Sequence, residues 1–207
     1  VDGSLAENCV NGIRALALYA FDESLVFSNT FILQIEDNLA QITRLQENEF
    51  AVKMSSFKFT KSSCAIADSQ ELQFNFEGTD IKFYPVSVGN PHAVIFQDNL
   101  SDQIPEMGLT LQESNIYKNG VNVGFVEILN EKEINLRVVE RGVGETLACG
   151  SGACAAVLSG VKNNLLQSSV LVNFKKGKLK VEVNLDEEWF NLIGEAKYIE
   201  KGIKINP

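Results

Sequence analysis

A short pattern that occurs twice in this 207-residue chain constrains its fold more than any other feature. The segment Cys9–Ala15 matches Cys149–Ala155 at the cysteine, at the glycine three positions later and at the final alanine. Leu18 and Leu158 extend the match toward the C-terminus. A repeat of this kind predicts two halves of similar build, each presenting one cysteine.

The second cysteine lies where a loop is expected to become a helix. A β-favouring run at Ile134–Val139 and a glycine-spaced turn at Arg141–Gly144 precede it, and small residues follow from Gly150 onward. At a helix start the backbone N–H groups have no helical partner, and the helix dipole is positive. We therefore expect the Cys149 thiol to lose its proton more easily than a free thiol. The same N–H groups are expected to hold a carboxylate or an oxyanion.

The repeat also predicts how the two cysteines are arranged. If a pseudo-twofold axis relates the halves, the thiols of Cys9 and Cys149 face each other across one cleft. Two opposed thiols suit the removal of a proton from one face of a carbon and its return on the other. The remaining cysteines, Cys64 and Cys154, are expected to be buried structural residues.

The pattern of elements predicts an α+β fold. Residues 11–21 are apolar nearly all round and indicate a short buried helix, and residues 150–163 indicate a second one. Elsewhere the sequence often alternates with a period of two, as β-strands do. Strands are expected at residues 31–35, 50–54, 72–76, 81–84, 120–129, 133–140, 170–174, 179–183 and 189–193.

Each half therefore combines many strands with one helix, which differs from the strand–helix alternation of a doubly wound fold. We expect an N-terminal half at residues 1–110, carrying Cys9, and a C-terminal half at residues 111–207, carrying Cys149. One or two further helices are expected between residues 101 and 117, interrupted at Pro105 and Gly108.

Composition excludes several classes of function. A formal charge of −9 argues against nucleic acid as a partner, because nucleic acid binding needs a basic surface. No apolar run approaches the ~20 residues of a membrane-spanning helix. Four cysteines without a C-x-x-C pair, together with a single histidine, fit neither a zinc site nor a disulfide framework. Reduced thiols in the cytoplasm are the simpler expectation. Because the sequence opens on Val1, we expect it to be part of a longer protein.

Several motifs together resemble the diaminopimelate epimerase family. They are Asp2–Ser4, Cys9–Arg14, Gly89–His92, Val121–Val123, Glu140–Ala156 and Gly194–Ala196. The resemblance spans nearly the whole chain, and the segment Glu140–Ala156 is its most specific part. It implies two pseudo-symmetric halves, each a curved, mostly antiparallel sheet or barrel wrapped around a central helix.

The resemblance also implies a function. Members of this family are isomerases that make precursors of lysine and peptidoglycan. They need no pyridoxal phosphate and no metal. It inverts one stereocentre of diaminopimelate, between the L,L and meso forms, by a two-base cysteine mechanism. For this chain the expected partner is therefore a small diamino diacid substrate, bound by a monomer or a homodimer.

Matching positions carry the family's roles onto this sequence. The resemblance implies that Cys9 and Cys149 are the acid/base pair, with His92 beside the first thiol and Glu140 beside the second. Recognition of the distal amino-acid end of the substrate falls to Asn90, Asn122, Glu140 and Arg141. The carboxylate at the reacting carbon is expected to bind the backbone of Val10 together with Asn11, Gly150 and Ser151.

Two departures from the family leave alternatives open. Val10 stands where the family usually has glycine, and a β-branched residue suits a positive φ poorly. A related racemase acting on glutamate, proline or hydroxyproline is therefore an alternative, as is a non-catalytic member of the fold. The family's N-terminal segment, which contributes substrate contacts, has no counterpart before Val1. A reversible disulfide between Cys9 and Cys149 would more simply be an inactivated state.

Overall fold

The computed structural model describes residues 9–35 and 38–199. This part of the chain contains the helices α1 (Val10–Asp22), α2 (Ile104–Glu113) and α3 (Gly150–Lys162), and a short 3-10 helix at Ser62–Cys64. The strands before α2 are β1 (Thr30–Ile35), β2 (Asn38–Gln46), β3 (Glu49–Met54), β4 (Gln73–Phe76), β5 (Thr79–Lys82), β6 (Tyr84–Ser87) and β7 (Pro91–Gln97). Those after α2 are β8 (Asn122–Asn130), β9 (Glu133–Glu140), β10 (Gly144–Thr146), β11 (Ser169–Phe174), β12 (Gly177–Asn184) and β13 (Trp189–Glu195).

Most of these strands form one long, curved sheet. Its order is β1-β2-β3-β13-β12-β11-β9-β8-β7-β6, with β10 paired to β9 beside this path. Neighbouring strands are antiparallel, except that β7 runs parallel to β8 and β11 runs parallel to β9. The strands β4 and β5 form a separate hairpin. Its turn residues, Glu77 and Gly78, both have positive φ, as a two-residue hairpin turn requires.

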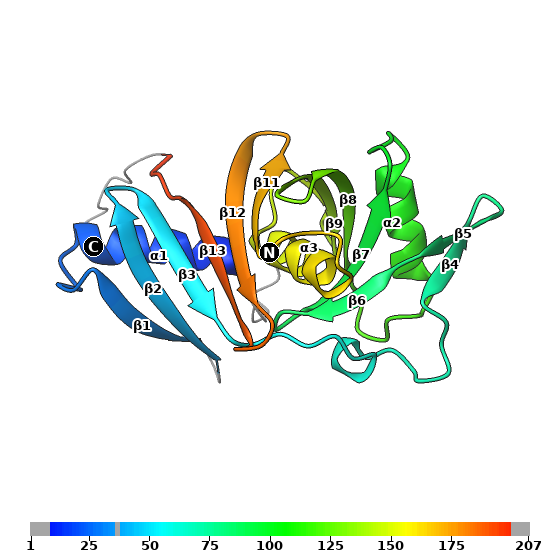
Figure 1. The fold of residues 1–207 in the computed structure, drawn as a ribbon, viewed down its shortest axis with the longest axis horizontal. Coiled ribbons are helices and arrows are strands. Elements are labelled where there is room, and N and C mark those ends of the chain that lie inside the picture. Colours follow the sequence, from blue (N-terminus) through cyan, green and yellow to red (C-terminus); the bar gives the residue numbers. More distant parts are fainter. Residues whose placement is uncertain (1–8, 36–37, 200–207) are drawn as a thin grey trace, which may run out of the picture.

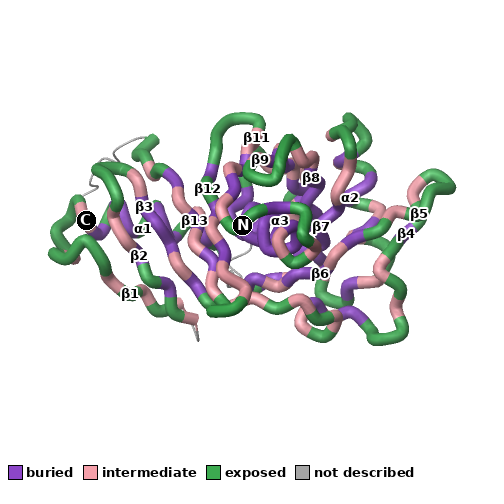
Figure 2. The backbone as a smooth tube through the Cα atoms, in the orientation of Figure 1, coloured by how far each residue is buried: buried purple, intermediate pink, exposed green. Residues whose placement is uncertain are grey.

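The helix α3 is the centre of the larger part of the molecule. The strands β6–β9, β11 and β12 curve around it, and Figure 1 shows it enclosed by them. Every residue from Gly150 to Gly160 is buried, so the helix appears almost wholly purple in Figure 2. Small side chains permit this close packing: a β-carbon on Gly160 would stand 2.3 Å from Cδ1 of Leu166. This confirms the predicted helix at residues 150–163.

The helix α1 has the same length but a different environment. It packs against β3 and β13 through Val10, Ile13, Ala17 and Leu18, which are buried. Its opposite side exposes apolar residues, including Leu16 and Tyr19, each 47% exposed. A helix at residues 11–21 is therefore confirmed, but its expected burial is limited to one side.

The expected fold class is confirmed: the molecule is α+β, with one part of the curved sheet against α1 and another around α3 (Figure 1). The sheet is continuous between them, because β3 pairs with β13. The strands β7 and β8 lie on either side of residue 110 and pair from His92 and Asn122 to Gln97 and Glu127. The division into halves at 1–110 and 111–207 stays a prediction.

Two local predictions are wrong or incomplete. The strands β2, β7 and β10 were not among those expected; in β2, polar residues interrupt the alternation. The segment at 101–117 forms one uninterrupted helix from Ile104 to Glu113, where breaks at Pro105 and Gly108 were expected. Pro105 lies in the first turn, where its missing N–H costs nothing. Gly108 lets the helix approach the sheet, since a β-carbon there would stand 2.6 Å from Cγ2 of Val139.

In the described ranges, no helix has the length and apolar character needed to cross a membrane.

Candidate active site

The site is built where the N-termini of α1 and α3 meet. Cys9 is the N-cap residue of α1, and Cys149 is the N-cap residue of α3. Each cysteine precedes a helix of 13 residues, as the sequence repeat predicts. The two helices come close at Gly150, whose β-carbon, if it had one, would lie 2.7 Å from Oδ1 of Asn11.

A small cavity of about 80 Å³ lies between the two helix starts. It is lined by Cys9, Val10, Asn11, Asn90, Glu140, Ala148, Cys149, Gly150 and Ser151. Eight of these residues were predicted as site residues from the sequence, and Ala148 is the additional one. Both thiols therefore line one cavity, at the N-termini of two helices.

Hydrogen bonds hold the Cys149 side chain in the lining of this cavity. The backbone N–H of Gly152 donates a hydrogen bond to its Sγ at 3.4 Å, and the Ser151 hydroxyl lies 3.5 Å from the same atom. Burial, as the largest cause, and the nearby Glu140 carboxylate together raise the pKa of the Cys149 thiol to about 11. The hydrogen bonds from Ser151 and Gly152 lower the pKa, but by less. The prediction that this thiol is more acidic than a free one is therefore wrong, because desolvation outweighs the helix start.

The Cys9 side chain has a different environment. The residue is exposed, and its thiol, like that of Cys149, is not in a disulfide. A β-carbon on Gly12 would lie 3.2 Å from Cys9 Sγ, so the glycine leaves room for the thiol above the first turn of α1. The two cysteines thus occupy equivalent positions in the repeat, but only one of them is desolvated.

Glu140 ends β9 and faces Cys149. The Thr146 hydroxyl donates a hydrogen bond to Glu140 Oε1, which joins the carboxylate to β10. The predicted location of Glu140 beside the second thiol agrees with its effect on the pKa of Cys149.

His92 lies behind the cavity wall. It is 1% exposed, and its Nε2 is 3.2 Å from Oδ1 of Asn90, which does line the cavity. Burial, as the larger cause, and the positive charge of Arg141 together lower the pKa of His92 to about 3. The ring is therefore neutral at physiological pH. The predicted contact between His92 and Cys9 stays a prediction.

Asn122 and Arg141 also lie outside the cavity lining. The backbone N–H of Arg141 donates to Oδ1 of Asn122 at 2.9 Å, which joins the start of β8 to the turn after β9. The Arg141 side chain donates from Nη1 to the carbonyl of Asn119 at 2.7 Å. These residues were expected to recognise the far end of the substrate, and that role stays a prediction.

Val10 is the first residue of α1 and is fully buried. It is not among the described residues with positive φ. A helical φ is one that a β-branched residue can adopt, so Val10 does not strain this turn.

Arg14 was not predicted as a site residue. It is 7% exposed, and its Nη2 donates to Asn11 Oδ1 at 2.9 Å. Burial lowers the pKa of Arg14, while the nearby sulfur atoms of Cys154 and Cys9 act in the opposite direction. The available signal was a single arginine in an otherwise apolar helix.

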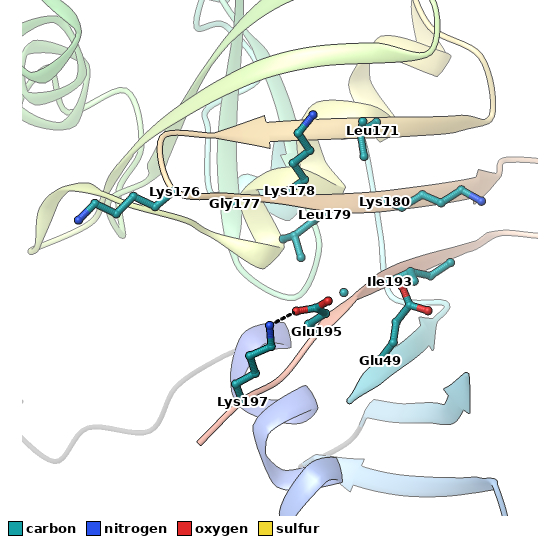
Figure 3. A pocket seen from close by; sticks show the side chains of 11 residues that line it. Glu49, Leu171, Lys176, Gly177, Lys178, Leu179, Lys180, Ile193, Glu195 and Lys197 are labelled. Atoms are coloured by element: carbon teal, nitrogen blue, oxygen red, sulfur yellow. Dashed lines mark ion pairs between the residues drawn. The ribbon is translucent and has the colours of Figure 1, made fainter. Parts of the chain in front are cut away.

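A larger cavity, of about 620 Å³, lies elsewhere, over β12 and β13 (Figure 3). Its polar lining is formed by Glu49, Lys176, Lys178, Lys180, Glu195 and Lys197. Lys197 pairs with Glu195 at 2.6 Å, as the dashed line in Figure 3 marks. This cavity is lined by neither thiol nor by any residue of the two cysteine motifs.

Residues 84–199 match the family model described as diaminopimelate epimerase. The diaminopimelate epimerase of Teredinibacter turnerae is 34% identical over 205 residues, which cover 97% of this chain and 74% of that protein. The diaminopimelate epimerase of Vesicomyosocius okutanii is 35% identical over 203 residues, with the same shares covered.

Solved structures are similar in fold. A probable proline racemase from Agrobacterium radiobacter has a TM-score of 0.66 at 12% identity, covering 94% of this chain and 67% of that one. A phenazine biosynthesis protein of the PhzF family from Bacillus anthracis has a TM-score of 0.61 at 15% identity, covering 94% and 75%. Identity this low supports the fold alone. On the sequence match and the shared site motifs, the chain belongs to the diaminopimelate epimerase family.

Proposed function

We propose that this protein converts L,L-diaminopimelate to meso-diaminopimelate by a two-thiol acid/base reaction that uses no pyridoxal phosphate. The observation that carries the proposal is that two cysteines, each capping a helix, line one cavity. A carbon held between them would meet one thiol on each face. The choice of diaminopimelate as the substrate is supported by related proteins that are named diaminopimelate epimerase.

The reaction needs three things that the cavity can supply. The α-hydrogen of an amino acid is a very weak acid, so a base must remove it from one face while an acid waits on the other. Cys9 and Cys149 take these roles. Negative charge that develops on the carboxylate is stabilised by the N–H groups at the starts of α1 and α3. Asn11, Gly150 and Ser151 hold this carboxylate, together with the backbone of Val10.

The two thiols take opposite roles in each direction of the reaction. Since burial and Glu140 keep Cys149 protonated at neutral pH, this thiol is poised to donate a proton. Cys9 is then the base in that direction, and the roles exchange in the reverse direction. After Cys149 has donated its proton, the N–H of Gly152 and the Ser151 hydroxyl stabilise its thiolate.

The cavity volume indicates how the substrate lies. About 80 Å³ accommodates the reacting end, whereas pockets for whole ligands commonly reach about 300 Å³ or more. The distal amino-acid end therefore extends past Asn90 and Glu140 toward Asn122 and Arg141. Amide and guanidinium groups suit a second carboxylate, and Glu140 suits a second ammonium group.

The proposal is tested with reduced protein and L,L-diaminopimelate, followed by a separation of the stereoisomers. Formation of meso product, abolished in Cys149→Ser, is expected. Parallel reactions with glutamate, proline and hydroxyproline test the related racemase activities. Inversion of one of those amino acids with no reaction of diaminopimelate would replace the proposed substrate. No reaction of any of them by folded, reduced protein would favour a non-catalytic member of the fold.

We further propose a cytoplasmic location and a monomeric or homodimeric state. The support for the first is that the four cysteines are free thiols. Light scattering on the purified protein measures the second. A tetramer or larger assembly would contradict it.

A further inference from the structure

Two asparagines line the cavity, and each has its amide oxygen beside a buried nitrogen. Asn11 Oδ1 is 2.9 Å from Arg14 Nη2, and Asn90 Oδ1 is 3.2 Å from His92 Nε2. An asparagine side chain has one accepting end and one donating end, and its hydrogen-bond partners decide which end faces a given direction. The partners behind the wall therefore determine what the cavity presents to a ligand.

The partner of Asn11 leaves no choice of orientation. A guanidinium group only donates hydrogen bonds, so the Asn11 atom beside it must be the oxygen. Arg14 is held tightly, because its guanidinium also lies against the backbone of Gly194, where a β-carbon would be 3.5 Å from Nε. In the described part of the chain, Nε and Nη1 are buried without a hydrogen-bond partner. The Asn11 oxygen is therefore the acceptor for a cation that is otherwise poorly compensated, and its NH₂ group is left for the cavity.

His92, the partner of Asn90, also fixes the orientation of the asparagine amide, although its imidazole ring is neutral. A neutral imidazole carries one N–H, and its Nδ1 here has no partner among the described residues. With the proton on Nε2 the ring donates to Asn90 Oδ1, and Nδ1 is an unpaired acceptor. The other tautomer would bury an unpaired N–H, which is rarer in folded proteins. The Tyr117 hydroxyl, 3.4 Å from the His92 carbonyl, helps to fix the residue from the opposite side.

A third asparagine follows the same rule beside the cavity. Asn122 accepts from the backbone N–H of Arg141, which can only donate. Three asparagines near the site therefore have their oxygens bound to protein donors, and this leaves the NH₂ groups available.

We propose that Arg14 and His92 are positioning residues, which hold the amides of Asn11 and Asn90 so that both direct NH₂ groups at substrate carboxylates. This rests on the proposed function, which it deepens by assigning the basis of selection for a diacid. NH₂ groups bind carboxylates and repel no anion, while the charge of Arg14 stays behind the wall. The base and acid roles remain with the two thiols.

The substitution Asn11→Asp, which replaces an NH₂ group by an oxygen, tests whether Arg14 orients the Asn11 side chain. In Asn11→Asp one carboxylate oxygen replaces the amide oxygen beside Arg14, and the other replaces the NH₂ group in the cavity. The Tm should be equal or higher, since a buried cation gains a counter-ion, while KM for L,L-diaminopimelate should rise at least about tenfold. The control is Asn184→Asp, which adds the same charge far from the site and keeps its accepted hydrogen bonds from Asp186 and Glu187. An Asn11→Asp protein with wild-type KM would overturn the proposal.

Kinetics separate positioning by His92 from tuning of a thiol. In His92→Gln a side-chain NH₂ can still donate to Asn90, whereas in His92→Phe it cannot. We expect KM to rise by about tenfold in the phenylalanine variant and less in the glutamine variant, with the pH dependence of kcat/KM unchanged in both. A shifted pH profile with an unchanged KM would instead make His92 a group that tunes Cys9.

The tautomer of His92 can be measured by NMR without any substrate. In ¹⁵N NMR spectra of the wild-type protein, His92 should show a protonated Nε2 and an unprotonated Nδ1 from pH 6 to pH 8. A protonated Nδ1 would overturn the assignment even if diaminopimelate is the substrate. If instead the tautomer is as expected and diaminopimelate does not react, the proposed function fails while the orientation of the amides stands.

Discussion

Gly150 and Asn11 lie in contact at the junction of the two helix starts. The α-carbon of Gly150 is so close that a β-carbon would stand 2.7 Å from Asn11 Oδ1 and 3.2 Å from Leu192 Cδ2. Because Gly150 follows Cys149 and Asn11 lies two residues after Cys9, this contact sets how the two thiols are spaced. The absence of a side chain at Gly150 is therefore needed for the close approach of the two helix starts.

Substitution of that glycine should impair catalysis more than folding. In Gly150→Ala the start of α3 or the Asn11 side chain must move, and small displacements of reacting groups can reduce rates by up to about a hundredfold. We expect kcat/KM to fall at least about tenfold, with a loss of about 1–3 kcal/mol in the free energy of unfolding. Steady-state kinetics and urea unfolding measure both quantities.

The matched control is Gly177→Ala. Gly177 begins β12 without a positive φ, and in the described part of the chain nothing lies within 4 Å of its missing β-carbon. This variant should match wild type in both measurements. Equal activity of Gly150→Ala and wild type would show that the junction tolerates movement.

Removal of the Glu140 charge should make Cys149 more acidic. Burial is the larger cause of the raised pKa, and the Glu140 carboxylate adds to it. In Glu140→Gln the negative charge beside the thiol is lost, so less work is needed to form the thiolate and the pKa moves down from about 11 toward 9. The ¹³Cβ shift of Cys149, followed across pH, measures this. A pKa that stays or rises would contradict the assigned role of Glu140.

Most residues that line the cavity could be predicted because they lie in the two local cysteine motifs. A helix start is a local feature, so the cap positions of Cys9 and Cys149 could be read from neighbouring glycines and small residues. The acidity of Cys149 could not, because it depends on how deeply the thiol is buried by residues distant in the sequence. Arg14 was missed for the same reason: its partner is near in sequence, but its burial follows from β13 packing against α1.

In the fold, too, local features were predicted and features that depend on distant residues were missed. Strands with clear alternation, such as β9, were predicted to within a residue or two, whereas β2 was missed because its polar residues interrupt the alternation. Helix α2 was expected to break at Gly108. Gly108 instead lets the helix pack closely against Val139, a residue distant in the sequence that no local pattern reveals.

The other two cysteines should be dispensable for chemistry. Cys64 and Cys154 are buried, and neither lines the cavity between the helices. Burial raises the pKa of the Cys64 thiol, and the same cause raises that of Cys154 beyond the range of a useful acid or base. In Cys64→Ala and Cys154→Ala we expect a loss of about 1 kcal/mol in stability from the removed packing, and retained turnover. A hundredfold loss of kcat in folded Cys154→Ala would contradict this.

A two-point ion pair between strands should contribute to stability above acidic pH. Arg137 Nε and Nη2 donate to the two oxygens of Glu145 at 2.7 and 2.8 Å, and Lys175 lies 3.0 Å from the same carboxylate. The hydrogen bonds from Arg137 are the main cause that lowers the pKa of Glu145 to about 2. A depressed acid pKa stabilises the fold above the ordinary value near 4.5, and that stabilisation is lost as pH falls toward 2.

Glu145→Gln tests this assignment. We expect it to lower the free energy of unfolding by about 1 kcal/mol at pH 6 and by less at pH 3. The control is Glu195→Gln, which removes a mostly exposed pair with Lys197 and should change stability little. A deficit in Glu145→Gln that is the same at both pH values would show that charge is not the cause.

If two different thiols act on opposite faces of one carbon, the hydrogen that enters the product must come from the solvent-exchanged thiol and not from the substrate. Reduced enzyme is mixed with L,L-diaminopimelate in deuterated water, and both isomers are isolated during the first few per cent of reaction. We expect meso product with deuterium at the inverted carbon, while the remaining L,L substrate keeps its protium. Protium retained in the product, or deuterium entering the substrate as fast as the product, would mean that a single base works on both faces and would rule out the two-thiol reaction.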